Sequence, residues 1–197
     1  MTVNQSSQKR IHYQKKGIRV LGIAESYLKG SAKSVLAGVV MRRDKVIDGI
    51  VFGKTSIEGN DATDSIQSMY ATLQRTDINC IILDGLIISM FNIVDANHLS
   101  IVTGLPVIAV TFDDSSGIED SIRHRFNDWE ERVEMYRGLG QRERVSLGTG
   151  KDLFIRYWKL EKSAATAILN SFTLQGSVPE PIRLAKLCAR ACAHALK

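Results

Sequence analysis

The segment INCIILDGLIIS, residues 78–89, is an almost unbroken apolar run with a single carboxylate, Asp84, in its middle. The residues before Asp84 are cysteine, isoleucine and leucine, which is typical of a strand buried within a sheet. Burying an unpaired charge is costly, so a carboxylate in this position normally has a partner or a metal ion. Gly85 follows directly and, having no side chain, lets backbone or a ligand come close. We therefore expect Asp84 to end a buried strand at a functional edge of the sheet.

Three apolar segments upstream are rich in β-branched residues and predict three more strands. Only a short polar stretch, residues 42–44, separates the second segment from the third, so these two strands must pair as an antiparallel hairpin. The three predicted strands cover residues 18–24, 34–42 and 45–53.

Helical spacing replaces the strand pattern between the third and fourth strands. Apolar residues recur on one helical face over residues 66–73, and Asn60 or Asp61 is a suitable N-cap. Residues 91–102 predict a second helix and residues 105–112 a fifth strand. Because two strands joined by a crossover helix pair in parallel, we expect a mixed sheet with an antiparallel meander at one side.

This order resembles the ribonuclease H-like fold, an α/β architecture in which the ends of the first and fourth strands lie side by side. We expect a sheet of about five to six strands flanked by helices. We also expect a flexible basic arm over residues 1–16 and a single domain over residues 17–197. The C-terminal part predicts a charged helix over 118–137, a Gly- and Arg-rich loop over 138–152, a strand over 153–158, and helices over 161–172 and 178–196.

The composition is that of an ordinary soluble protein, with 44% hydrophobic and 24% charged residues in a chain of 197. The formal net charge of +5 makes DNA or RNA a plausible partner. No apolar stretch reaches the roughly 18 residues that span a bilayer, and from the polar start we expect no secretory signal. The three cysteines read as reduced thiols without a disulfide-linked partner. We expect a cytoplasmic protein without a membrane partner; its oligomeric state stays open.

Several acidic residues are expected near the end of the fourth strand. Glu25 ends the first strand, and Asp61 and Asp64 lie in the first turn of the following helix. Carboxylates that converge on a cleft repel one another unless a cation is bound, and oxygen-rich clusters suit Mg²⁺ or Mn²⁺. We therefore predict that Glu25, Asp61 and Asp84 hold a metal, with Asp64 as a further catalytic candidate. Each has a structural alternative, as a hydrogen-bonded carboxylate or as a helix cap.

Other residues are candidates for contact with a nucleic acid. Tyr27 can stack on a base, or it can be an ordinary core or loop aromatic residue. Arg142, Arg144 and Lys151 lie among glycines in the loop of residues 138–152, where they could contact phosphates. An ordinary loop without such a role is the alternative.

Five segments together resemble an archaeal family catalogued as domain of unknown function ninety-nine, which is similar to endonuclease V. They are RVLGIAESYLKG, VLAGVVMRRDKVIDGIVFG, GNDATDSI, IILDG and PEPIRLAKL, within a resemblance that runs from Gly17 to His194. The resemblance implies a divalent-metal-dependent endonuclease that acts on DNA or RNA, with a role in nucleic-acid repair. A catalytically degenerate nucleic-acid-binding protein, or a regulatory or scaffold protein of the same fold, is the alternative.

One departure from the endonuclease V pattern concerns the first strand. Ala24 stands where endonuclease V has an aspartate, and Glu25 comes one residue later. In a strand, a shift of one residue moves a side chain to the opposite face unless a bulge or a longer side chain compensates. We expect Glu25 to approach Asp84 closely enough for one hydrated cation to bridge them. If Glu25 faces the other way, with no second acid near Asp84, a two-metal mechanism has too few ligands.

Overall fold

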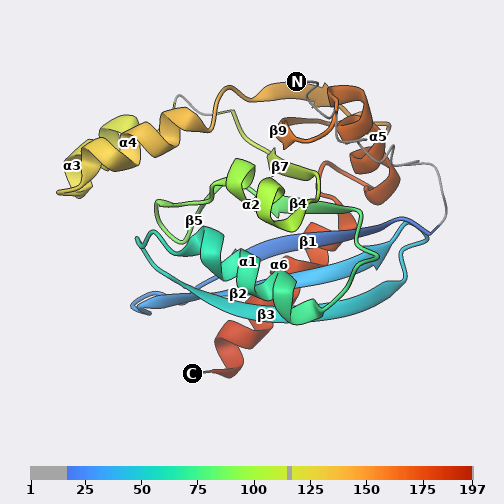
Figure 1. Cartoon of the computed structure of the whole chain (residues 1–197), viewed down its shortest axis with the longest axis horizontal. Coiled ribbons are helices and arrows are strands. Elements are labelled where there is room, and N and C mark those ends of the chain that lie inside the picture. The colour runs from blue at the N-terminus through green and yellow to red at the C-terminus, as the bar shows by residue number, and fades with distance from the viewer. Residues whose placement is uncertain (1–16, 115–116, 197) are drawn as a thin grey trace, which may run out of the picture.

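The predicted strands form one mixed sheet in the computed structural model of the protein, which describes residues 17–114 and 117–196. The sheet has seven strands in the order β3-β2-β1-β4-β7-β9-β8 (Figure 1). β1 pairs in parallel with β4, and β4 with β7, whereas the remaining pairs are antiparallel. The expected mixed sheet is therefore confirmed. Its strands are β1 (Arg19–Ser26), β2 (Lys33–Arg42), β3 (Ile47–Ser56), β4 (Cys80–Asp84), β7 (Val107–Thr111), β8 (Glu143–Ser146) and β9 (Asp152–Trp158). The predicted basic arm, residues 1–16, lies outside the described residues.

Helices cover both faces of the sheet (Figure 1). One face packs against α1 (Ala62–Leu73) and α2 (Ala96–Thr103), and the other against α5 (Lys162–Phe172) and α6 (Glu180–Ala195). Side chains of a strand alternate between the two faces. In β1, Leu21 and Ile23 pack toward α1, whereas Val20 and Ala24 pack on the side of α5 and α6. This alternation determines which acidic side chains can meet.

Helix α6 approaches β1 closely because the facing residues are small. A Cβ atom added at Gly22 would lie 2.6 Å from the backbone carbon of Pro181, at the start of α6. Ala24 packs against Ala185 of the same helix. The short side chains let α6 lie almost directly on β1, near the end of β4.

A short hairpin replaces the first part of the predicted helix over residues 91–102. Its strands are β5 (Ile87–Ile88) and β6 (Asn92–Ile93), and α2 begins only at Ala96. Ser89, Met90 and Phe91 between the strands have φ of 47°, 56° and 71°, which lie in the left-handed region. A right-handed helix cannot run through such residues, so the predicted start of this helix was wrong.

The C-terminal part differs from the prediction in two places. The predicted helix over residues 118–137 is two helices, α3 (Glu119–Arg125) and α4 (Trp129–Gly138). The predicted loop contains β8, in which Val145 is buried and which pairs with β9. The sheet therefore has seven strands instead of five to six.

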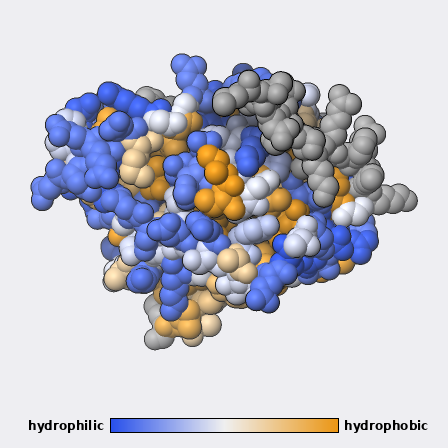
Figure 2. Space-filling model, viewed as in Figure 1, coloured by the Kyte–Doolittle hydropathy of each residue, from blue (hydrophilic) through white to orange (hydrophobic). Residues whose placement is uncertain are grey.

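The polarity of the surface differs from one element to another. Figure 2 shows a mainly hydrophilic surface over α3 and α4, and an apolar patch over α2, whose exposed side chains include Ile101 and Val102. Among the described residues, no helix combines the length and the apolar character needed to cross a lipid bilayer.

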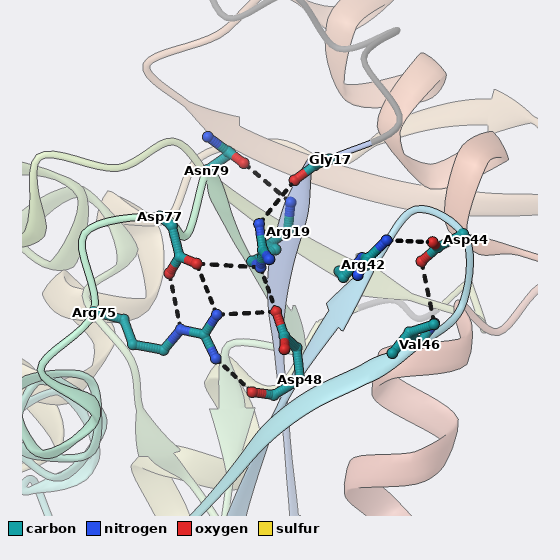
Figure 3. Close-up of polar contacts among 9 residues, drawn as sticks. All are labelled: Gly17, Arg19, Arg42, Asp44, Val46, Asp48, Arg75, Asp77 and Asn79. Atoms are coloured by element: carbon teal, nitrogen blue, oxygen red, sulfur yellow. Dashed lines mark hydrogen bonds and ion pairs between the residues drawn. The ribbon is translucent and has the colours of Figure 1, made fainter.

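An ion-pair network ties the sheet together at the end opposite to Asp84 (Figure 3). The Arg75 guanidinium lies 3.0 Å from Oδ2 of Asp48 and 2.7 Å from Oδ2 of Asp77, and Arg19 also binds Asp48. Hydrogen bonds from Arg19 and Arg75 hold the pKa of Asp48 below its usual value. The network joins the start of β1, the start of β3 and the segment before β4.

Candidate functional site

The end of β4 lies beside the end of β1, at the centre of the sheet. β1 and β4 pair in parallel register up to Ile23 and Leu83, which brings the next residues, Ala24 and Asp84, side by side. Gly85 has a φ of 88°, in the left-handed region that favours glycine. The chain therefore turns away directly after Asp84, and the prediction that the first and fourth strands end together is confirmed.

The Asp84 carboxylate faces α6 and forms an ion pair there. Its Oδ2 lies 2.8 Å from Nζ of Lys186, and the Asp84 side chain is 12% exposed whereas that of Lys186 is 51% exposed. Ile82 and Cys80, two and four residues earlier in β4, pack on the same side of the sheet. An ammonium group is thus the counter-charge that the buried position of Asp84 requires.

Lys186 was not among the residues singled out from the sequence. A signal for it exists in the pattern of α6, where the buried Ile182, Ala185 and Ala189 mark the helical face that meets the sheet. Lys186 lies four residues after Ile182, so it belongs at the border of that face. The helical pattern does not tell which strand end Lys186 lies beside in the folded protein.

Glu25 faces the opposite side of the sheet from Asp84. Its carboxylate accepts hydrogen bonds of 2.8 Å from both the backbone N–H and the hydroxyl of Ser89. Both acidic residues border a small cavity with Ile88 and Val94, but their carboxylates are bound on different faces. β1 pairs with β2 in continuous register from Arg19 to Ser26, so no bulge corrects the one-residue shift. The two carboxylates therefore have separate partners on different faces, and a cation bridge between Glu25 and Asp84 stays a prediction.

Asp61 is held by hydrogen bonds inside the loop between β3 and α1. It accepts from the hydroxyls of Thr55 at 2.6 Å and Ser56 at 2.8 Å, and from the side-chain amide of Asn92 at 2.8 Å. Burial alone would raise the pKa of Asp61, but these bonds and the Ser56 N–H outweigh it, so the pKa lies well below its usual value. The side chain does not cap α1; the Asn92 side chain does so instead, by accepting from the N–H of Ala62.

The remaining acidic candidate does not complete a metal site. Asp64 is exposed in the first turn of α1. Within residues 17–114 and 117–196, no group of three or more His, Cys, Asp and Glu side chains is arranged to hold a metal ion. Asp84 offers one carboxylate, and an ammonium already binds it. These donors do not fit the carboxylate-bound Mg²⁺ or Mn²⁺ that the resemblance implied.

Two aromatic residues directly follow strands that end at this edge of the sheet. Tyr27, directly after β1, is 40% exposed and so is not a core residue. Phe112 follows β7, and Nζ of Lys186 lies 5.7 Å from the centre of its ring. This edge therefore combines an ammonium, a carboxylate and aromatic surface.

The three basic candidates of the predicted loop lie on and around β8. Arg144 binds Asp152. Arg142 donates to the carbonyl of Asp113 at 3.3 Å, which places it near the end of β7. Lys151 is exposed in the turn between β8 and β9. Arg142 thus lies close to the carboxyl edge of the sheet, where it pairs with Asp114 at 3.4 Å, and Arg144 pairs with Asp152.

Comparison with known proteins identifies the family of this chain. The sequence matches the family described as endonuclease dU over residues 16–193. The chain belongs to the endonuclease dU family. A UPF0215 protein of Pyrobaculum aerophilum is 34% identical over 90% of this chain and 95% of its own length. Membership of the endonuclease dU family supports a nuclease-like function.

Two solved structures have folds similar to that of this endonuclease dU family member. A protein of unknown function from Archaeoglobus fulgidus is 27% identical and superimposes with a TM-score of 0.77, covering 90% of this chain and 99% of its own. Endonuclease V of Ciona intestinalis, solved with DNA containing an inosine, is 17% identical with a TM-score of 0.63, covering 92% of this chain and 88% of its own. The second likeness shows a shared fold.

Proposed function

We propose that this protein is an endonuclease that cuts nucleic acid at the edge of the sheet formed by the ends of β1 and β4, with DNA that contains deoxyuridine as its substrate. The name of the family to which the chain belongs, endonuclease dU, supports this substrate. The structural observation that supports this location is Asp84, which ends a central strand and remains 12% exposed beside an ammonium. The carboxyl ends of parallel strands are where such sheets usually bind ligands.

The position of Asp84 favours a functional role over a purely structural one. A structural ion pair needs no glycine after it and no exposed partner, and replacing such a pair with apolar residues is often neutral or stabilising. Here Gly85 turns the chain away from the carboxylate, and Lys186 is half exposed. A ligand that approaches this edge meets both charged groups and the exposed ring of Tyr27.

The test is a cleavage assay with labelled oligonucleotides, in single- and double-stranded form. The panel contains deoxyuridine, deoxyinosine or neither in DNA, and inosine or no modified base in RNA. We expect cleavage of DNA with deoxyuridine, and its loss in Asp84→Asn. Asp95→Asn is the matched control, because Asp95 is an exposed N-cap of α2 and asparagine caps helices equally well. Activity that survives in Asp84→Asn refutes the role of Asp84.

The same assay measures the metal requirement. Each reaction is run with Mg²⁺, with Mn²⁺ and with a chelator. Dependence on Mg²⁺ or Mn²⁺ stays a prediction drawn from the resemblance, because Glu25 and Asp61 are bound elsewhere and Asp84 is paired with an ammonium. Asp64→Asn tests the last acidic candidate.

The separation of the acidic residues favours a second candidate function. A protein that binds nucleic acid without cutting it needs no cluster of carboxylates, and none is assembled among the described residues. Binding to the panel with no cleavage under any metal condition would support this alternative and would refute the endonuclease proposal.

A further inference from the structure

Lys186 occupies the place where a carboxylate-bound cation would be expected. Its Nζ lies 2.8 Å from the Asp84 carboxylate and 5.7 Å from the centre of the Phe112 ring. These two contacts hold the ammonium between the end of β4 and the segment after β7. The site therefore has one built-in positive charge supplied by α6.

The solvent exposure of the two charged residues determines which kind of ligand can bind. Asp84 is 12% exposed and Lys186 is 51% exposed, so Lys186 is the more accessible partner of the pair. An ammonium has three N–H donors. One serves Asp84, which leaves donors for an anion that approaches from solvent. Such an anion meets the more accessible positive group first.

The neighbours of Lys186 on α6 extend the positive surface. Arg183 and Arg190 lie three residues before and four residues after Lys186, so all three project from the same side of the helix. Arg190 is exposed, and Arg183 is anchored by Glu180 at 3.3 Å and by the carbonyl of Val178. Lys186 lies at the edge of the sheet that contains Asp84, with Arg183 before it and Arg190 after it along α6. A chain of phosphates is the kind of ligand that fits a row of separated cations.

We propose that Nζ of Lys186 contacts a backbone phosphate of the bound nucleic acid next to Asp84, and that the stripe of Arg183, Lys186 and Arg190 continues this contact along the strand. This inference deepens the proposed function and rests on it for the identity of the ligand. It makes Lys186 a substrate-binding residue at the same edge as the proposed site of cleavage.

The experiment measures binding of the full chain to one labelled, unmodified DNA duplex over a range of salt concentrations. Each phosphate contact contributes about 0.9 to the slope of log K against log[salt]. Lys186→Met should lower that slope by about 0.9, so that between 50 and 200 mM salt its affinity falls about 3.5-fold less than that of the wild type. Lys186→Arg should keep the wild-type slope.

Lys162→Met is the matched control. Lys162 forms an ion pair with Glu143 at the same 2.8 Å and is 46% exposed, but its partner belongs to β8. Its removal should leave the salt slope unchanged. Thermal unfolding of each variant separates lost binding from lost stability. An unchanged slope in Lys186→Met, whatever its melting temperature, overturns the inference, because an ion pair with a structural role alone does not change the number of phosphates bound.

The outcomes separate this inference from the proposed function. Binding with the expected change of slope, but no cleavage of any substrate, supports the phosphate contact and refutes the nuclease. Cleavage of DNA with deoxyuridine, with an unchanged slope in Lys186→Met, supports the nuclease and overturns the phosphate contact. A wild type that binds no DNA at low salt overturns both.

Discussion

Replacement of Glu25 distinguishes a structural carboxylate from a catalytic one. Its two oxygens accept bonds of 2.8 Å from the N–H and the hydroxyl of Ser89. Ser89 is 1% exposed and begins the left-handed run of Ser89, Met90 and Phe91. We expect Glu25→Ala to lower the stability of the protein at neutral pH, because the N–H of Ser89 then lacks its acceptor in a buried position.

The size of this effect is the loss from the broken hydrogen bonds, reduced by the strain that is released. A hydrogen bond to a charged group contributes about 1.5–3 kcal/mol, and a buried group left without a partner costs about 1–3 kcal/mol. A left-handed residue other than glycine stores about 1–2 kcal/mol, part of which is released if the turn relaxes. We therefore expect Glu25→Ala to cost roughly 2–3 kcal/mol, and Glu25→Gln, which keeps one acceptor oxygen, about 1 kcal/mol.

The assay is thermal unfolding at pH 7, followed by fluorescence and by circular dichroism. For a chain of this size, 1 kcal/mol corresponds to about 2–4 °C in melting temperature, so Glu25→Ala should melt about 4–12 °C below the wild type. Glu134→Ala, in the exposed middle of α4, is the control and should change little. Wild-type stability in Glu25→Ala together with loss of metal-dependent cleavage would refute this reasoning and restore Glu25 as a ligand.

Three further predictions concern stability. Asp61→Ala should cost roughly 3 kcal/mol at pH 7, since it removes the acceptor of several hydrogen bonds. Because the pKa of Asp61 is lowered in the folded state, this stabilisation is present above the usual carboxyl pKa and is lost as the pH falls through the folded pKa. The urea midpoints of wild type and variant should therefore converge in strong acid. The pKa of Asp48 is lowered as well, so Asp48→Asn should flatten the loss of stability below about pH 4, and added salt should reduce the difference between the two proteins. Gly22→Ala should lower the melting temperature by displacing Pro181, since overpacking costs about 1–3 kcal/mol; Gly138→Ala, with no atom within 4 Å of the added Cβ, should not.

The strands of the sheet were predictable because each is dominated by one local signal. Apolar β-branched runs gave the central strands, and the short polar turn at residues 42–44 determined the pairing of β2 with β3. The hairpin at residues 87–93 and strand β8 were missed for a different reason. The left-handed turn is held by a distant carboxylate, and β8 is formed by pairing with β9 in a segment rich in glycine and charge. Neither cause is visible in local periodicity.

The candidate site, like the sheet, was predictable only where a local sequence pattern marks its residues. The position of Asp84 at a strand end followed from its apolar run and from the crossover connection. Its partner lies about a hundred residues later in the chain, on a helix whose packing no local pattern specifies. Two of the proposed ligands, Glu25 and Asp61, are held by hydrogen bonds to Ser89 and Thr55, which become neighbours only after folding.

The small residues of β1 explain why a lysine, and not a second acid, accompanies Asp84. Gly22 and Ala24 face α6, and their size lets Pro181 and Ala185 approach the strand. A longer side chain at residue 24 would push α6 outward, and an acidic one would add a second negative charge beside Asp84. With Ala24 in this position, α6 lies close enough for Lys186 to reach the carboxylate, and one ammonium balances one carboxylate. The acid one residue later faces the other side of the sheet, where it holds the turn after β5. The one-residue shift therefore changes the chemistry of this edge from a cluster of carboxylates to a single ion pair open to an anion.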